Sequence, residues 1–316
     1  MALFLSKLVG CDGWDASADW IAGHYERLRE ALTLWVLPPS ADTLRRMAEH
    51  VEMKGFFKDM VGEGKLLQID GKRARGAKAD GKIHHFIEAL HGKQVVGMVE
   101  SEEGAESPAI ITLLRSLNLE GLIVTIDAAG TTPAVVETIR ERNGDYLLTV
   151  EANQPILLKE IRQAFAENPA APQVTKDYGH GRNDIRRART LTRPDIISRL
   201  SAGERVPDIQ AICWIQRTRI TSQGIETTDQ FHIASWPLKA RDYLGINRGH
   251  WGIEAMHYVL DVSLNEDRSR IAKAAAVVAA MRRNAYAIID SLRGKLSYKR
   301  FSAKMRADPT LILNQI

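Results

Sequence analysis

The sequence predicts a mixed α/β protein built on a central, partly parallel β-sheet. In the first half of the chain, the predicted segments follow the order strand, strand, strand, helix, strand, helix, strand, helix. The strand segments GLIVTID and DYLLTVE are strongly apolar, which is typical of strands covered on both faces. Helical spacing of apolar residues before and after this region predicts helices at both ends of the chain.

The composition is that of an ordinary globular protein. The chain has 316 residues, of which 45% are hydrophobic and 26% charged, so fibrous, collagenous and disordered classes are excluded. Cys11 and Cys213 are too few for a disulfide framework or a four-ligand zinc site. No apolar segment is long enough to span a membrane, and a cytoplasmic protein is expected. The net charge of +4 allows nucleic-acid binding without requiring it.

Residues 1–62 are predicted to form a helical N-terminal region. Apolar residues recur at helical spacing in DWIAGHYERLREALTLWVL, and Pro38-Pro39 ends that helix. Ser40 or Asp42 is expected to cap the next helix.

Residues 63–172 are predicted to form the first part of the sheet and its helices. LLQID is expected to be a short strand that ends at Asp70, and KIHHFIEALH and QVVGMVE a hairpin, so that three strands form an antiparallel meander. The next helix is expected to have Ser107 as its N-cap and Pro108 at its first position. A second helix is expected to stop at Asn143-Gly144, and a third to run from about Gln154 to Glu167.

Two further regions follow a short linker. Residues 173–237 are predicted to be a β-rich insertion, with IQAICWIQRTRIT and TTDQFHIASW as the clearest strands. Residues 238–316 are predicted to be helical.

Two aspartates stand at the ends of apolar strands, Asp70 in QIDGK and Asp127 in TIDAAG. Because the carboxyl ends of neighbouring parallel strands meet at one edge of a sheet, these side chains are expected to lie together. Their mutual repulsion and hard oxygens suit Mg²⁺ or Mn²⁺. The alternative is that each aspartate only caps a turn.

A third acid, Glu254, is the candidate that completes the metal site. On a helix, Arg248, Trp251 and Glu254 fall three residues apart along one face. Trp251 is expected to pack this helix on the sheet while Glu254 reaches the metal. The alternative is a solvated glutamate beside a core tryptophan.

Basic residues gather in three places, after Asp70, in the insertion and near the C-terminus. Such clusters are typical of proteins that bind a phosphate backbone, and the alternative is a solvated surface. The clusters comprise Lys72, Arg73, Arg75, Lys78 and Lys82; Lys176, Arg182, Arg186, Arg187, Arg189 and Arg193; and Arg282, Arg283, Arg293, Lys295, Lys299, Arg300, Lys304 and Arg306.

Other chemistries have no support in the sequence. His84 and His85 point to opposite sides of a strand, and His250 and His257 are seven residues apart, so a histidine-rich zinc site is not expected. The sequence contains no GxGxxG, P-loop or GxSxG motif, which argues against nucleotide-cofactor and serine-hydrolase chemistry.

Six ordered blocks resemble the DDE transposases of bacterial insertion sequences, specifically the H-repeat-associated, ISAs-type group. The blocks cover nearly the whole chain. They are GCDGWDASADW, LPPSADTLRRM, IDGKRARG, GLIVTIDAAGTTPAVVETIRERNGDYLLTVEANQP, DYGHGRNDIRRAR and RGHWGIEAMHYVLDVSLNEDRSR.

The resemblance implies a ribonuclease H-like mixed sheet flanked by helices, with the β-rich insertion between the second acid and the glutamate. It implies that Asp70, Asp127 and Glu254 are the catalytic residues and the ligands of two Mg²⁺ or Mn²⁺ ions. The implied partner is double-stranded DNA, held by a homodimer at the nucleoid of a bacterial cell. The residues expected to bind DNA are Lys72, Arg75, Asn153, Arg182, Arg186, Arg187 and Arg248.

Two departures from the family pattern leave alternatives open. The sequence lacks an earlier segment with a DPR…HPL-like motif, so the N-terminal region is expected to be truncated. Glu151 and Ala152 stand where the family usually has lysine and glycine. The alternatives are a catalytically inactive, DNA-binding relic and a stand-alone nuclease with the same core.

Overall fold

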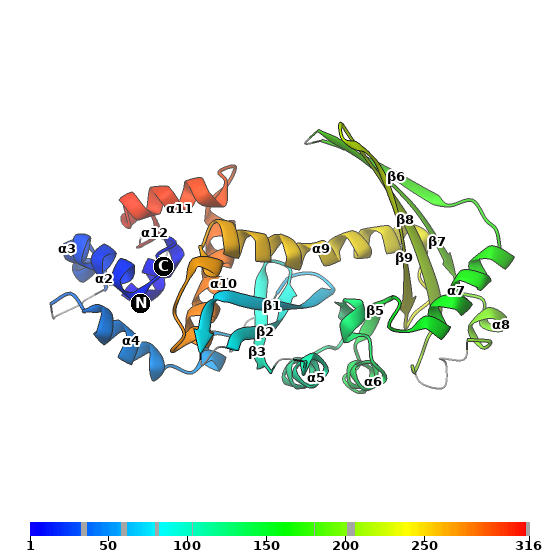
Figure 1. The fold of residues 1–316 in the computed structure, drawn as a ribbon, viewed down its shortest axis with the longest axis horizontal. Coiled ribbons are helices and arrows are strands. Elements are labelled where there is room, and N and C mark those ends of the chain that lie inside the picture. Colours follow the sequence, from blue (N-terminus) through cyan, green and yellow to red (C-terminus); the bar gives the residue numbers. More distant parts are fainter. Residues whose placement is uncertain are drawn as a thin grey trace. The chain divides into compact units, whose positions relative to one another are not determined.

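The computed structural model describes residues 1–32, 37–57, 62–79, 82–102, 104–179, 181–200 and 206–313. The chain is a mixed α/β protein, as predicted, and its elements are labelled in Figure 1. It divides into two compact units. The first comprises Met1–Glu63, Gly71–Ala105 and Ile253–Ile316, and the second comprises Gly64–Asp70 and Glu106–Gly252. No helix among the described residues is long and apolar enough to cross a membrane.

The helices of the first unit come from both ends of the chain. Residues Leu5 and Leu8 of α1 share one apolar core with Tyr286 and Ile289 of α10. The helices are α1 (Ala2–Leu8), α2 (Trp14–Gly23), α3 (Tyr25–Leu32), α4 (Ala41–Glu49), α10 (Ala275–Leu292), α11 (Tyr298–Ala307) and α12 (Thr310–Leu313), with the 3₁₀ turns η1 (Met53–Phe56) and η4 (Glu266–Arg268).

The N-terminal region is helical, as predicted, but its first long helix is divided. The chain leaves helical geometry at His24, where φ is −117° and ψ is 15°, so α2 and α3 replace one continuous helix. Ser40 is the N-cap of α4 and accepts a hydrogen bond from the backbone N–H of Thr43, as predicted.

The strands of the first unit are ordered β3-β2-β1. β2 (Lys82–His91) and β3 (Gln94–Ser101) form the predicted antiparallel hairpin, whose turn contains Gly92 at φ +65°. The prediction that the first strand ends at Asp70 is wrong, because β1 runs from Leu66 to Ala79. Beyond Asp70 the strand neighbours β2, and Lys72 and Ala74 are buried while Arg73 and Arg75 are exposed. This short alternation supports a strand that the charged letters conceal.

The second unit contains a mixed sheet in the order β1-β4-β5-β9-β8-β7-β6. β1 through Ile69 pairs in parallel with β4 (Ile123–Ile126), which pairs in parallel with β5 (Asp145–Val150). The remaining pairs are antiparallel. Residues predicted as β-rich form four strands, here called the arm: β6 (Gln173–Gly179), β7 (Arg182–Leu191), β8 (Ala211–Thr221) and β9 (Gly224–Ala234).

Helices lie between and after these strands. They are α5 (Glu106–Ser116), α6 (Pro133–Glu141), α7 (Pro155–Glu167), the short α8 (Pro194–Ile197), the 3₁₀ turn η2 (Ala128–Gly130) and the first part of α9 (Ala240–Val262). Ser107 is not an N-cap, because α5 already begins at Glu106. α6 ends before Asn143, whose φ of 57° stops the helix as predicted.

Candidate functional site

Asp70 and Asp127 lie side by side at the carboxyl ends of the paired parallel segments. β1 and β4 are paired from Leu66 opposite Ile123 to Ile69 opposite Ile126, and each aspartate is the next residue of its chain segment. The parallel direction therefore delivers both carboxylates to the same end of the pair, as predicted.

The environment of Asp127 disfavours its negative charge. Burial raises the pKa of this carboxyl, and the nearby carboxylates of Asp70, Glu106 and Glu151 raise it further. The backbone N–H of Gly130 opposes this increase in pKa by donating to Oδ1 of Asp127 at 3.2 Å. A cation at this position would relieve the repulsion among the acids.

The turn after Asp127 is held by the start of the next connection. Nδ2 of Asn153 donates to the carbonyl of Ala128 at 2.7 Å, and Nε2 of Gln154 donates to the carbonyl of Thr131 at 2.7 Å. Gly130 is required there, because a Cβ at this position would lie 2.3 Å from Cγ2 of Ile126. Asn153, expected to bind DNA, thus has a side-chain contact that fixes the backbone beside Asp127.

Helix α9 contacts the same strands through residues that sequence reasoning missed. Nε2 of Gln68 donates to the carbonyl of Gly249 at 3.0 Å, and a Cβ on Gly249 would lie 2.3 Å from Leu66. Nδ1 of His250 lies 2.9 Å from Oγ1 of Thr125. Burial lowers the pKa of His250, and the Asp70 carboxylate partly opposes that decrease. The sequence signal that could have indicated these contacts is the Gly249-His250 pair shortly before the predicted glutamate, Glu254.

Trp251 does not pack the helix on the sheet, contrary to expectation. Its side chain is 42% exposed, and the guanidinium of Arg217 lies 5.3 Å from its ring centroid. Gly249 and His250 make the close contacts instead, because a glycine admits nearer approach than an indole.

Glu254 lies on an exposed position of α9, next to the buried Ile253. It belongs to the first unit, whereas Asp70 and Asp127 belong to the second. Among the described residues, no group of three or more His, Cys, Asp or Glu side chains is arranged to hold a metal ion. The structure thus pairs the two aspartates, whose hard oxygens and repulsion fit a divalent cation, and Glu254 as third ligand stays a prediction.

Lys72 does not contribute to a DNA-binding surface, which corrects the prediction. Its side chain is 7% exposed, and Nζ lies 2.7 Å from Oδ1 of Asp261 and 4.0 Å from Oε2 of Glu266. Arg75, three residues further along β1, is exposed. It lines a hollow of about 560 Å³ whose other charged residues are Lys78, Asp267, Arg268 and Arg270.

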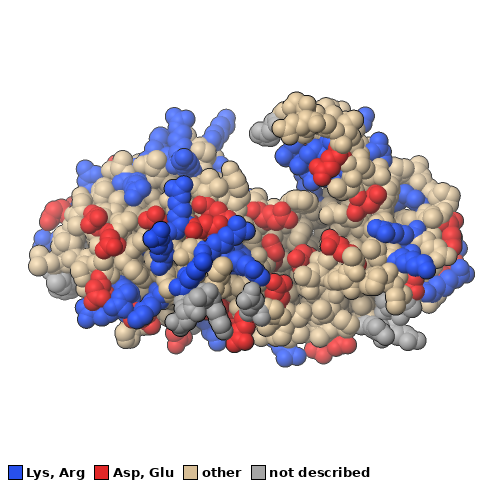
Figure 2. All heavy atoms as spheres, in the orientation of Figure 1, with Lys and Arg blue, Asp and Glu red and all other residues tan. Residues whose placement is uncertain are grey.

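The arm carries most of the remaining basic residues predicted to bind DNA. Arg182, Arg186 and Arg248 line a hollow of about 650 Å³. In Figure 2, Lys and Arg side chains gather below the tip of the long strands, next to acidic ones. Arg187 lies on the opposite face of β7 from Arg186 and donates to Oγ1 of Thr218 at 3.4 Å. It is therefore not part of the same hollow.

The C-terminal basic run is divided between core and surface. Arg282 and Arg283 are buried at 3% and 0% exposure. Contrary to the prediction, they do not contribute to a DNA-binding surface. Arg283 is paired with Glu88 and Glu266, which neutralise it inside the first unit. Lys299, Lys304 and Arg306 on α11 are exposed, and Figure 2 shows basic side chains projecting there.

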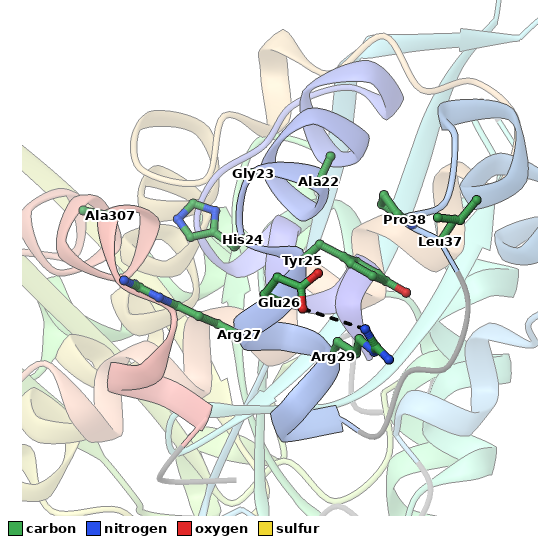
Figure 3. A pocket seen from close by; sticks show the side chains of 10 residues that line it. All are labelled: Ala22, Gly23, His24, Tyr25, Glu26, Arg27, Arg29, Leu37, Pro38 and Ala307. Atoms are coloured by element: carbon green, nitrogen blue, oxygen red, sulfur yellow. Dashed lines mark ion pairs between the residues drawn. The ribbon is translucent and has the colours of Figure 1, made fainter.

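A further hollow of about 840 Å³ lies among the N-terminal helices of the first unit (Figure 3). Its charged side chains include Glu26 and Arg29, which form an ion pair at 3.8 Å and are 85% and 55% exposed. Tyr25 and His24 also line it. Exposed pairs of this kind contribute little binding energy, and we assign this hollow no function.

The family model described as "Transposase DDE domain" matches residues 62–289. Putative transposase YncI of Escherichia coli O157:H7 is 25% identical over 320 aligned residues, covering 93% of this chain and 82% of the relative. H repeat-associated putative transposase YhhI of Escherichia coli K12 is 26% identical over 288 residues, covering 84% and 76%.

One solved structure is a piggyBac transposase synaptic complex with hairpin DNA. It is 11% identical with a TM-score of 0.47, and the match covers 89% of this chain and 57% of that chain. The present chain thus spans little more than half the length of that protein.

Proposed function

The chain belongs to the transposase DDE domain family, and from this premise we propose that it cleaves DNA at insertion-sequence ends and joins those ends to target DNA. The observation that carries the proposal is the register of β1 and β4, which sets Asp70 beside Asp127. The H-repeat-associated resemblance of the six sequence blocks agrees with the curated relatives.

We propose that Asp70, Asp127 and Glu254 hold the divalent cations, two Mg²⁺ or Mn²⁺ ions. When bound, such ions activate an attacking oxygen and stabilise the charge of a phosphodiester during in-line displacement. The chain's own residues prepare the site. Asn153 and Gln154 fix the turn after Asp127, while Gln68 and His250 hold α9 against the strands. Exposed arginines, including Arg75 and Arg248, would hold the DNA backbone without reading bases.

The proposed core is ribonuclease H-like. It comprises residues 63–172 and the helix that carries Glu254, with residues 173–237 as the insertion. Residues 1–62 and the basic C-terminal helices complete the proposed division. We further propose that two copies act together on double-stranded DNA, one at each end of the element, in the bacterial cytoplasm at the nucleoid.

Asp127→Asn tests the catalytic assignment. The variant keeps the shape of the side chain but removes the charge, so Mg²⁺-dependent nicking of supercoiled DNA should fall by at least about 100-fold. DNA binding should change little. Asp229→Asn, which removes an exposed carboxylate from β9, is the matched control and should nick normally. Undiminished nicking by Asp127→Asn would contradict the assignment.

Glu151 favours a second candidate, a DNA-binding relic without activity. This glutamate stands near Asp127 and adds to the negative potential there. Calorimetric titration with Mn²⁺ separates the two candidates. An active enzyme should bind the ion in a manner that Asp127→Asn abolishes, whereas a relic should bind DNA but show no such ion site.

A further inference from the structure

Asp184 is a buried carboxylate in the middle of a basic surface. It lies on β7 and is 3% exposed, although Arg182 and Asn183 just before it are exposed. Four arginines surround it. The separations are 3.4 Å from Nε of Arg182, 3.7 Å from Nη2 of Arg186, 3.4 Å from Nε of Arg217 and 3.0 Å from Nε of Arg219. We call these four residues the arginine cluster.

Strand register explains the cluster. Asp184 is opposite Arg219 on β8, and Arg186 is opposite Arg217. Because alternate residues of a strand share a face, Arg182, Asp184 and Arg186 point the same way. The partners on β8 share that face, so one side of the arm presents four guanidinium groups around a single carboxylate.

The charge of the cluster is not balanced within the hollow that it lines. One carboxylate offsets one of four positive charges. Asp177, on β6 opposite Asp184, adds a second carboxylate and pairs with Arg186 and Arg248. Five arginines and two aspartates therefore line this hollow of about 650 Å³, for a net charge of +3.

The geometry around Asp184 leaves donors available. Arg217 and Arg219 donate to Oδ1 of Asp184 through Nε, and among the described residues no hydrogen bond joins their Nη groups to that carboxylate. The Arg217 guanidinium also lies over the ring of Trp251, 5.3 Å from its centroid, and this contact favours its position. The fork of donors on an arginine matches the oxygens of a phosphate group.

We propose that Asp184 is a positioning residue, which holds the arginine cluster in place to bind phosphate groups of a DNA backbone. This inference rests on the proposed function for its ligand. Without the carboxylate, four like charges on one sheet face would repel one another and lose their fixed orientation. A buried acid would thus strengthen the binding of a polyanion.

The proposal predicts a change in DNA-binding affinity that is opposite in sign to the change expected from net charge alone. Removing a negative charge from a DNA-binding surface ordinarily tightens binding, because long-range attraction increases. Asp184→Asn should instead weaken binding of a short duplex of arbitrary sequence by about tenfold, which corresponds to about 1.4 kcal/mol. The slope of log K against log salt concentration should also become shallower by about 0.9 for each phosphate group that the variant no longer binds.

The matched control is Asp229→Asn in the full-length chain. Asp229 is an exposed acid on β9 whose partners are Trp214 and Gln216 rather than arginines. This variant removes the same charge from the same arm, and binding should stay unchanged or tighten slightly. Fluorescence anisotropy at several salt concentrations measures both variants beside the unaltered chain, and thermal melting reports whether each is folded.

Each outcome of these measurements either supports or overturns the inference. If the Asp184→Asn variant binds DNA as tightly as the unaltered chain, or more tightly, the inference is overturned and the proposed function is unaffected. If the unaltered chain binds no duplex, both the inference and the proposed function are overturned. If Asp184→Asn does not fold, Arg219→Gln replaces it, since this variant leaves the carboxylate three arginine partners. A shallower salt slope for Arg219→Gln supports the phosphate site, and an unchanged slope overturns it.

Discussion

At the scale of single residues, the least predictable feature is which cations are buried. Arg283 was expected to be a surface charge, but it is fully buried, and its Nε donates to Oε1 of Glu88 at 2.9 Å. Carboxylates that accept its hydrogen bonds offset the cost of burying the charge of this arginine. Glu88 lies 195 positions earlier in the chain, so no local sequence pattern could reveal the pair.

Asp70 and Asp127 show what sequence reasoning can predict. Apolar strands that run into an acid indicate where a parallel sheet delivers carboxylates, and the register of β1 and β4 agrees. Burial is the main cause of the raised pKa of Asp127, and the carboxylates of Asp70, Glu106 and Glu151, which come from separate segments of the second unit, raise it further. That electrostatic environment is a property of the fold and is not encoded in the spacing of the two aspartates.

Lys7 provides a pH-dependent prediction. Its Nζ is buried in the first unit and donates to the carbonyl of Gly13 at 3.1 Å and to Oγ of Ser17 at 2.7 Å. Burial, aided by the charge of Arg282, lowers the pKa of Lys7 from 10.5 to about 7. Between these values the unfolded chain binds more protons than the folded chain, so the free energy of unfolding rises with pH.

Replacement of Lys7 by Met should remove that rise. The unfolding free energy of the unaltered chain minus that of Lys7→Met should increase by about 1.4 kcal/mol per pH unit across this window. Urea denaturation at several pH values measures it. Lys299→Met, at an exposed position of α11, serves as control and should follow the unaltered chain. Parallel curves for Lys7→Met and the unaltered chain would disprove the assignment.

At the scale of elements, the types were predicted better than their limits. The predicted strands and helices of residues 63–172 are present, yet β1 continues nine residues beyond Asp70, to Ala79. The segment KRARGAKA has a charged composition that masks its strand character. Its conformation is stabilised by a neighbouring strand and by close backbone packing at Gly76, neither of which local propensity reports.

Gly76 on β1 is predicted to be essential for that packing. A Cβ at this position would lie 2.4 Å from the carbonyl oxygen of Ser269 and 2.5 Å from that of Asp267. Because both neighbours are backbone atoms, Gly76→Ala should lower the free energy of unfolding by about 1–3 kcal/mol. Gly179→Ala on β6, where nothing lies within 4 Å, should have little effect. Equal urea midpoints for the two variants would show that η4 can move aside.

The arm illustrates a different limit. The region was predicted to be β-rich, with two clear strands, and its arginines were predicted to bind DNA. The centre of the arginine cluster, Asp184, carried no such signal, because its partners Arg217 and Arg219 come from another strand. Cross-strand register, which sequence alone does not determine, converts separate charges into one site.

At the scale of the whole molecule, neither compact unit is a continuous stretch of chain. The first unit is assembled from three segments and the second from two. The short segment Gly64–Asp70 contributes Leu67 and Ile69, both fully buried, to the second unit. A sequence divided into consecutive domains cannot represent this arrangement, because strand β1 contributes residues to both units.

A fragment of residues 106–252 is therefore predicted not to fold by itself. It lacks the residues Leu66–Ile69 that pair with β4, so β4 would become an exposed, apolar edge. Unpaired edges of this kind promote aggregation. Attaching residues 64–70 to the same fragment through a flexible glycine-serine linker should restore the parallel pair and give a soluble product with a cooperative thermal transition. Size-exclusion chromatography and circular dichroism compare the two. If the fragment without residues 64–70 melts cooperatively at the same temperature, the first strand is dispensable and the division into these units is wrong.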